Sequence, residues 1–173
     1  MIRKAKQEDI DAVEKSYTEH LLHEKENGAY TVWKLGVYPT RKTAENALSD
    51  GALYVMEEAD EICASMILNQ TVPAEYGSIQ WKCRANPTGV LVLHLLCVRP
   101  SKAGRGIGKK MVLFAIEEAK RRNCEAVRLD TGKQNIPAVS LYTKLGFGLA
   151  GTASMSIGGK IAHDDHLFFE KIV

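Results

Sequence analysis

Several features that often reveal a protein's class are missing from this chain of 173 residues. Its four cysteines form no C-x-x-C pair and have no histidine beside them at metal-ligand spacing, which argues against a zinc site or a disulfide framework. No segment approaches the roughly 18 apolar residues of a membrane span, and the N-terminus has no apolar signal-peptide core. We therefore expect a cytosolic (cytoplasmic) protein with reduced thiols and no bound metal.

Strong net charge is also missing. The formal charge is +2, which is too small to indicate nucleic acid or an anionic membrane as a partner. Hydrophobic residues make up 45% of the chain and charged residues 25%, which is typical of a globular protein. Because no internal repeat or low-complexity tract interrupts the sequence, we predict one domain over residues 1–173.

What the chain does have is a glycine-rich turn between a predicted strand and a predicted helix. The apolar run Val90–Val98 ends at Arg99-Pro100, and an amphipathic helix follows the glycines at 104, 106 and 108. A helix start presents free backbone N–H groups at its partly positive end, and glycine lets a ligand approach the backbone closely. The turn is therefore predicted to bind a phosphate or pyrophosphate group.

The spacing of this turn differs from the two common nucleotide-binding loops. Lys109-Lys110-Met111 follows the last glycine, so the Lys-Ser/Thr end of a P-loop is absent. Gly-x-Gly-x-x-Gly is not present either, which argues against a Rossmann fingerprint. Residues 99–110 contain no acid, so a positive field is expected from their basic residues, which are Arg99, Lys102, Arg105, Lys109 and Lys110.

Periodicity predicts the remaining elements. Residues 1–5 are a short strand or a disordered tip, and helices are expected over 7–25, after Thr40 as N-cap, over 107–122 and after Asn135 as N-cap. Further strands are expected over 52–57, 62–69 and 126–130, and a final hairpin over 147–157 and 162–171. The strand–helix–strand order from Val90 to Asp130 implies a right-handed parallel crossover.

Two segments taken together resemble a known family. L-x-V-x-P at 96–100, the Gly-x-Gly-x-Gly loop, and LDT at 129–131 followed by Asn135, Leu141-Tyr142 and Gly146-Phe147 are similar to the GNAT superfamily of acyl-CoA N-acyltransferases. The resemblance covers the whole chain. It implies a three-layer α/β (α+β) fold in the order β-α-α-β-β-β-α-β-α-β-β, with a mixed, mostly antiparallel sheet that is splayed at its centre.

The resemblance also implies acetyl-CoA as the co-substrate. In that family the pantetheine arm enters the splay and bonds to strand backbone, here at Leu96, Cys97 and Val98. The loop amides that would hold the pyrophosphate are those of Arg105, Gly106, Ile107, Gly108 and Lys109. Asn135 matches a residue that hydrogen-bonds the cofactor arm. Ala103 stands where the family carries Gln or Arg, so a side-chain contact to phosphate is not expected there.

The reaction implied is transfer of an acetyl group to an amine by direct attack, with general acid and base assistance. Tyr142 matches the tyrosine that serves as general acid, and otherwise would be a core residue. His94 lies where many relatives carry Glu, and we expect it to be the base or a buried core histidine. Asp130 is another ionisable group nearby, although strand alternation is expected to point it away. Cys97 is expected to pack, because direct attack needs no cysteine nucleophile.

The acceptor is a primary amine of a small molecule or a protein. Acceptor-binding segments are expected at 28–40 and 70–89, where Tyr30, Trp33, Tyr38, Tyr76 and Trp81 either line a pocket or pack. The run His163-Asp164-Asp165-His166 suggests a metal, but alternation would send neighbours to opposite faces, which favours a polar hairpin. A non-catalytic acyl-CoA sensor remains the alternative function. The sequence also allows a homodimer through edge strands and offers no direct support for one.

Overall fold

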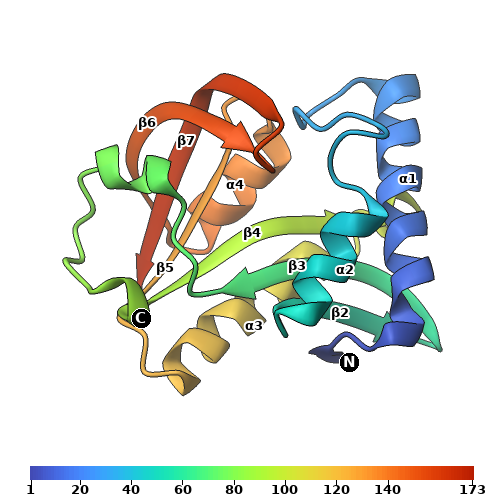
Figure 1. Cartoon of the computed structure of the whole chain (residues 1–173), viewed down its shortest axis with the longest axis horizontal. Coiled ribbons are helices and arrows are strands. Elements are labelled where there is room, and N and C mark those ends of the chain that lie inside the picture. The colour runs from blue at the N-terminus through green and yellow to red at the C-terminus, as the bar shows by residue number, and fades with distance from the viewer.

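The computed structural model describes residues 1–173 and contains one seven-stranded sheet (Figure 1). The strand order is β1-β2-β3-β4-β5-β7-β6. Only the β4–β5 pair is parallel. The strands are β1 (Ile2–Lys4), β2 (Leu53–Glu58), β3 (Glu61–Asn69), β4 (Val90–Val98), β5 (Ala126–Gly132), β6 (Gly148–Ile157) and β7 (Ile161–Ile172). This confirms the predicted mostly antiparallel sheet and the predicted order of helices and strands.

Helices cover both faces of the sheet. The helices α1 (Ile10–Asn27) and α2 (Arg41–Ser49) share one apolar core with β2, β3 and the end of β4. The helices α3 (Ile107–Arg121) and α4 (Ile136–Lys144) share the other core, with the first half of β4 and with β5. The two cores give the three-layer arrangement that the resemblance implies. None of the helices combines the length and the hydropathy needed to cross a membrane.

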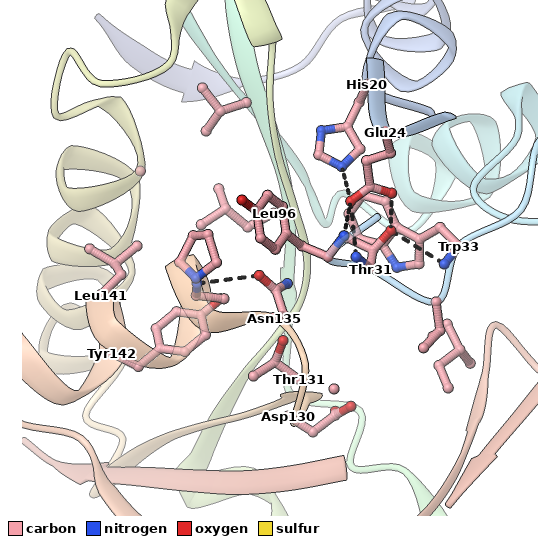
Figure 2. Close-up of a pocket in the computed structure, with 18 of the residues that line it drawn as sticks. His20, Glu24, Thr31, Trp33, Leu96, Asp130, Thr131, Asn135, Leu141 and Tyr142 are labelled. Carbon is pink, nitrogen blue, oxygen red and sulfur yellow. Dashed lines mark hydrogen bonds and ion pairs between the residues drawn. The ribbon is translucent and has the colours of Figure 1, made fainter. Parts of the chain in front are cut away.

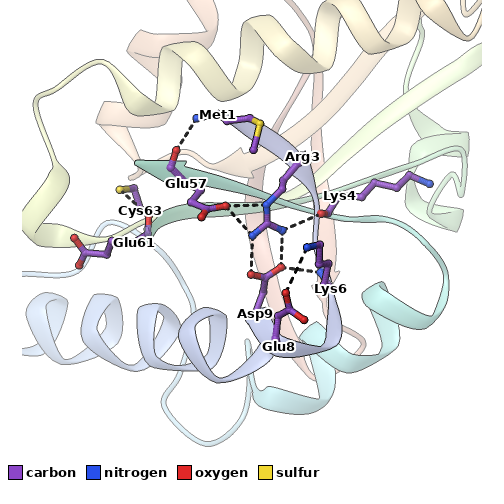
Figure 3. Close-up of polar contacts among 9 residues, drawn as sticks. All are labelled: Met1, Arg3, Lys4, Lys6, Glu8, Asp9, Glu57, Glu61 and Cys63. Carbon is purple, nitrogen blue, oxygen red and sulfur yellow. Dashed lines mark hydrogen bonds and ion pairs between the residues drawn. The ribbon is translucent and has the colours of Figure 1, made fainter. Parts of the chain in front are cut away.

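The N-terminus is a strand, which decides between the two possibilities left open by the sequence. Arg3 donates from both terminal nitrogens to the carboxylate of Asp9, at 2.7 and 2.9 Å, and its Nε donates to Glu57 at 2.8 Å (Figure 3). This bidentate pairing is a strong form of ion pair. It fixes β1 against the start of α1 and the end of β2.

Most helix ends lie where the sequence predicts them. The expected first helix begins with a short 3₁₀ turn at Gln7–Asp9, and Gly28 ends α1. Thr40 is the N-cap of α2, where its backbone N–H donates to Thr43 Oγ1 at 3.0 Å. The N-cap of α4 is Asn135, whose Oδ1 accepts from the backbone N–H of Ala138 at 3.3 Å. These caps satisfy N–H groups that the helices cannot pair themselves.

Residues 70–89 pack against the sheet instead of lining a pocket. Tyr76 is buried beside Phe168, and the Trp81 ring lies 4.3 Å below the Arg128 guanidinium. Arg128 also donates to Glu170 at 2.9 Å, and Glu170 accepts from the backbone of Lys82 and Cys83 at 3.0 Å each. This buried ion pair and its hydrogen bonds to the backbone of residues 82 and 83 hold the segment in place. The packing alternative for Tyr76 and Trp81 is therefore the correct one.

Candidate active site

The sheet opens at its centre, between the two parallel strands. The strands β4 and β5 pair at Val90–Leu93 with Ala126–Leu129, whereas β3 stays paired with β4 as far as Val98. Beyond Leu93 the edge of β4 that faces β5 therefore has no strand partner. A cavity of about 360 Å³ lies at this opening, and the residues on both of its walls include His94, Leu96, Val98, Asp130, Thr131 and Gly132.

A bulge in β4 sets which side chains face the cavity. Between the pairs Leu68–Leu93 and Met66–Leu96, β4 contains one residue more than β3. Leu91 and Leu93 pack in the core with α3, but Leu95 and Cys97 pack in the core with α1. The extra residue reverses the alternation of the strand, so that His94, Leu96 and Val98 line the cavity.

Cys97 contributes backbone to this wall and no reactive side chain. Its Sγ points to the other core, 3.8 Å from the Ser16 carbonyl oxygen. Burial raises the pKa of the Cys97 thiol to about 12. Because the thiolate is the nucleophilic form, this cysteine is inert at neutral pH. The four cysteines are free, and Cys83 is the one that is not fully buried.

The glycine loop presents a row of free donors. No backbone N–H from Gly104 to Lys109 donates to another group of the chain. Gly104 and Gly106 have φ of 75° and 74°, a conformation that disfavours other residues. A Cβ placed on either would meet nothing within 4 Å, so the outer side of the turn is open. The predicted anion-binding geometry is therefore present at the start of α3.

The positive field expected over this loop is largely neutralised. Glu19, Glu58 and Glu61, which lie far away in the sequence, pair with every basic residue of the loop except Lys109; the pairs are Arg99–Glu19, Arg99–Glu61, Lys102–Glu61, Arg105–Glu58 and Lys110–Glu58. The absence of acids from 99–110 thus gave a wrong expectation of unpaired charge. Anion binding here depends chiefly on the backbone amides. Ala103 lines the cavity and supplies no charge.

The helix α4 brings Asn135 and Tyr142 to the cavity, together with Leu141 (Figure 2). Tyr142 is 5% exposed and packs in tilted contact with Phe147 and Phe169. Burial and then the negative charge of Asp130 raise the pKa of Tyr142 well above its ordinary value. The phenol therefore keeps its proton at neutral pH. Asn135 reaches the cavity while also capping the helix, so its two predicted roles are compatible.

His94 lies in the cavity wall opposite this helix. Its Nε2 and the Asn69 Oδ1 are 2.7 Å apart. Since an amide oxygen accepts, the Nε2 carries the hydrogen and Nδ1 is left with a lone pair. Burial lowers the pKa of His94, despite the opposing charge of Asp130. The imidazole is therefore neutral near pH 7 and able to accept a proton.

Another end of the cavity is formed by the end of α1 and the loop that follows it. His20, Glu24, Thr31 and Trp33 gather there, away from Asn135 and Tyr142 (Figure 2). Glu24 accepts from the backbone N–H groups of Tyr30 and Thr31 at 3.0 and 2.9 Å, and from the Thr31 hydroxyl at 2.6 Å. Burial opposes ionisation, but the His20 ring, whose Nε2 lies 3.4 Å from Glu24 Oε1, and the hydrogen bonds from Thr31 outweigh it and lower the pKa of Glu24 to about 2. The carboxylate fixes the loop to the helix.

Of the two segments expected to bind the acceptor, one lines the cavity and the other does not. Residues 28–40 contribute Tyr30, Trp33 and Tyr38 to the cavity, as predicted. Residues 70–89 contribute none, and Ile157 and His166 of the C-terminal hairpin line the cavity instead. Sequence reasoning missed these contributions because they depend on pairings between distant strands.

The structure also reverses one expectation from strand alternation. Asp130 was expected to point away, yet it lines the cavity. It directly follows Leu129, the last residue of β5 that pairs with β4. Its Oδ2 lies 2.9 Å from His166 Nδ1, and its Oδ1 accepts from the Tyr76 hydroxyl at 2.8 Å. The His163–His166 run lies in β7, and no group of three or more His, Cys, Asp or Glu side chains is arranged to hold a metal ion.

Sequence comparison identifies related proteins. The chain is 28% identical to the uncharacterized N-acetyltransferase YvbK of Bacillus subtilis over 109 residues, which are 63% of this chain and 61% of that protein. It is 29% identical to a streptothricin acetyltransferase of Escherichia coli over 118 residues, which are 66% of this chain and 59% of that protein. The matched region is thus less than two thirds of each relative's length.

Solved structures share the fold. An acetyltransferase of the GNAT family from Streptococcus agalactiae superposes with a TM-score of 0.82 at 21% identity, covering 100% of this chain and 95% of that one. An acetyltransferase from Salmonella typhimurium, solved with its cofactor acetyl-CoA, has a TM-score of 0.69 at 19% identity, covering 99% and 92%. The profile of the acetyltransferase (GNAT) family matches residues 12–147. With the splayed sheet, the bulged β4 and the open amide loop, this match shows that the chain belongs to the GNAT family of acetyltransferases.

Proposed function

We propose that this chain, acting as a single domain, is an N-acetyltransferase that moves an acetyl group from acetyl-CoA to a primary amine of a small molecule or a protein. One observation carries the proposal. The unpaired edge of β4, Gly108 at the end of the glycine loop and the buried, protonated Tyr142 line the same cavity, and the free amides of the loop lie next to Gly108 in the chain. A thioester donor and a proton donor for its leaving thiolate would therefore meet there.

The residues fit an acyl-CoA donor in two places. The amides of Arg105, Gly106, Ile107, Gly108 and Lys109 suit the pyrophosphate, because they are free and their turn is open to a ligand. The backbone of Leu96, Cys97 and Val98 suits the amide-containing pantetheine arm, which would add to the edge of β4 as a strand does. Asn135 would bond the same arm. The acetyl-CoA bound to the Salmonella typhimurium structure supports this choice of donor.

The chemistry requires a neutral amine and a proton for the leaving group. The amine nitrogen attacks the thioester carbonyl, the carbon–sulfur bond breaks, and the thiolate leaves with the electron pair. We assign Tyr142 as the general acid that protonates the thiolate, and His94 as the base that removes a proton from the attacking nitrogen. His94 then returns that proton to Tyr142 through the cavity. The buried environment of both groups suits these protonation states at neutral pH.

Two observations support an amine as the acceptor: the names of related enzymes, and the residues that line the cavity near the loop after α1. Streptothricin acetyltransferase and mycothiol acetyltransferase are among the relatives. Tyr30, Trp33 and Tyr38 offer aromatic surface, and Asp130 offers a carboxylate, which together suit an aromatic or aliphatic ammonium group.

The test is a thiol-release assay with acetyl-CoA and a panel of amines that contains polyamines, amino acids, aminoglycosides and peptides with free N-termini. We expect CoA release that depends on at least one amine, with the acetylated amine detected by mass spectrometry. Saturable binding of acetyl-CoA without release on any amine would instead indicate an acyl-CoA sensor. Absence of binding at about millimolar acetyl-CoA would contradict both functions, since such an affinity is weak for any specific site.

A further inference from the structure

Two histidines of β7 meet beside the cavity, which His166 lines, because of a second bulge. Between the pairs Ala153–His166 and Met155–His163, β7 contains one residue more than β6. The extra residue brings His163 and His166 to the same face, although their spacing of three predicts opposite faces. Their rings are in edge contact, with centroids 4.9 Å apart. The run lies in the predicted hairpin, and the bulge brings its two histidines together.

His166 is held by a carboxylate and has one free ring nitrogen. The ring is 3% exposed, lines the cavity and lies with Nδ1 2.9 Å from Asp130 Oδ2. The other oxygen of Asp130 is held by Tyr76, which fixes the carboxylate. The Nε2 of His166 is buried without a hydrogen-bond partner, and so is the Nδ1 of His163. Buried polar atoms are seldom left unpaired, so an orphaned nitrogen in a cavity wall indicates a missing ligand or proton.

The groups around His166 fix the orientation of its ring. Asp130 faces it from β5, and His163 faces it from its own strand. The opposing residues of β6, Ala153 and Met155, do not titrate. A carboxylate behind an imidazole fixes the Nδ1–H tautomer and stabilises the imidazolium that forms when Nε2 takes a proton.

Resting on the proposed function, we propose that His166, positioned by Asp130, accepts the proton that the acceptor ammonium must lose before it can attack. The ammonium gives one proton to Nε2 of His166, directly or through one water, and the N–H electron pair stays on the amine nitrogen. The imidazolium releases the proton to solvent past the half-buried ring of His163. This proton is the one that the complete reaction releases, because an ammonium and acetyl-CoA give an amide, a thiol and one proton.

This assignment gives the two cavity imidazoles different tasks. His94 and Tyr142 handle the proton that remains in the site and ends on the thiol. His166 handles the proton that leaves. The difference can be measured by varying the pH. At high pH the amine is already neutral in solution, so His166 is no longer needed, whereas high pH does not replace His94, which acts after the amine has attacked the thioester.

The experiment measures kcat/KM for the best amine of the panel between about pH 6.5 and 9.5, in the wild type and in His166→Gln and Asp130→Asn. Near pH 7 we expect a loss of about 100-fold in His166→Gln, the low end of the range for a lost general base. As the pH rises toward the pKa of the amine, the loss should shrink by about tenfold for each pH unit. The affinity for acetyl-CoA should not change. Asp164→Asn, an exposed carboxylate of the same strand, is the matched control and should behave as wild type.

A loss in His166→Gln that is the same at every pH, or smaller than twofold near pH 7, would overturn the inference while leaving the proposed function intact. Absence of turnover in the wild type would overturn both. If His166→Gln fails to fold, Asp130→Asn decides, together with nitrogen-detected NMR of the histidine rings in the wild type. That spectrum should show His166 as the Nδ1–H tautomer at neutral pH, and the Nε2–H tautomer would contradict the proposal.

Discussion

The cavity has two ends that arise in different ways. The donor end is made by neighbours in sequence, because strand β4, the glycine loop and helix α3 follow one another directly. The acceptor end is assembled from the end of α1, the loop after it, the end of β5 and the hairpin β6–β7. The comparison teaches that the part of the site proposed to bind the co-substrate is encoded largely by local sequence, while the part proposed to take the acceptor depends on contacts between distant segments.

The largest effect is expected where the two ends meet. Tyr142→Phe removes the proton donor for the thiolate and retains the packing against Phe147 and Phe169. We expect kcat to fall by about 100-fold or more, as for loss of a general acid, with acetyl-CoA affinity unchanged. Steady-state kinetics combined with calorimetric titration of acetyl-CoA would measure both. An unchanged kcat would remove Tyr142 from the chemistry.

The donor end alone can be broken at Gly106. Its φ of 74° disfavours a side chain, and a β-branched one most of all. Gly106→Val should weaken acetyl-CoA binding by about tenfold or more, because the amides of the turn would change direction. Gly77→Val is a suitable control, since a Cβ at Gly77 meets nothing within 4 Å and its φ is not left-handed. Equal affinities in the two variants would show that the turn does not bind the donor.

The acceptor end alone can be loosened at Glu24. Glu24→Gln removes the charge that holds Tyr30 and Thr31, so KM for the amine should rise several-fold while acetyl-CoA binding stays the same. The pKa of Glu24 is lowered to about 2 in the folded chain, so its ionised form stabilises the fold above about pH 4.5 and this contribution is lost as the pH falls toward about 2.

Denaturant unfolding at several pH values would measure that contribution. We expect the wild type to exceed Glu24→Gln by about 2 to 3 kcal/mol at neutral pH, and the difference to shrink as the pH falls. Glu26→Gln, an exposed acid of the same helix, is the control. A difference that does not depend on pH would mean that the carboxylate charge is not what anchors the loop.

The smallest effect is expected from the acids that neutralise the glycine loop. Glu58 pairs with Arg105 at 3.6 Å and with Lys110 at 3.3 Å, and all three side chains are partly exposed. Glu58→Gln should free both cations and strengthen acetyl-CoA binding by about twofold, an effect that added salt would remove. Glu117→Gln, whose partner is Lys120, is the matched control. Weaker binding in Glu58→Gln would contradict the view that Glu58 competes with the phosphates.

The sequence predicted the fold well where local patterns decide it. Apolar periodicity, the cap at Asn135 and the glycines at 28 and 146 placed the helices and strands in their observed order. Apart from Asn135, the residues proposed to bind the donor lie in one continuous motif, 96–109. In contrast, the charge of the glycine loop was wrong, because Glu58 and Glu61 reach it from the β2–β3 turn and no local pattern shows that approach.

A bulge explains a further error. One extra residue in β7 reverses the alternation on which the sequence argument for His163 and His166 depended. A bulge depends on the register of the partner strand, so a single strand's sequence does not reveal it. The spacing of His163 and His166 predicts opposite faces, so the sequence of β7 alone gave no signal that the two rings meet.

The most direct test of the account is an acetyl-CoA titration followed by backbone amide NMR. The account predicts saturable shifts at the amides of residues 96–98 and 105–109, with little change at Tyr30 and Thr31 in the absence of an amine. Saturable shifts confined to the 28–40 loop, or no shifts at about millimolar acetyl-CoA, would contradict the division of the cavity into a donor end and an acceptor end.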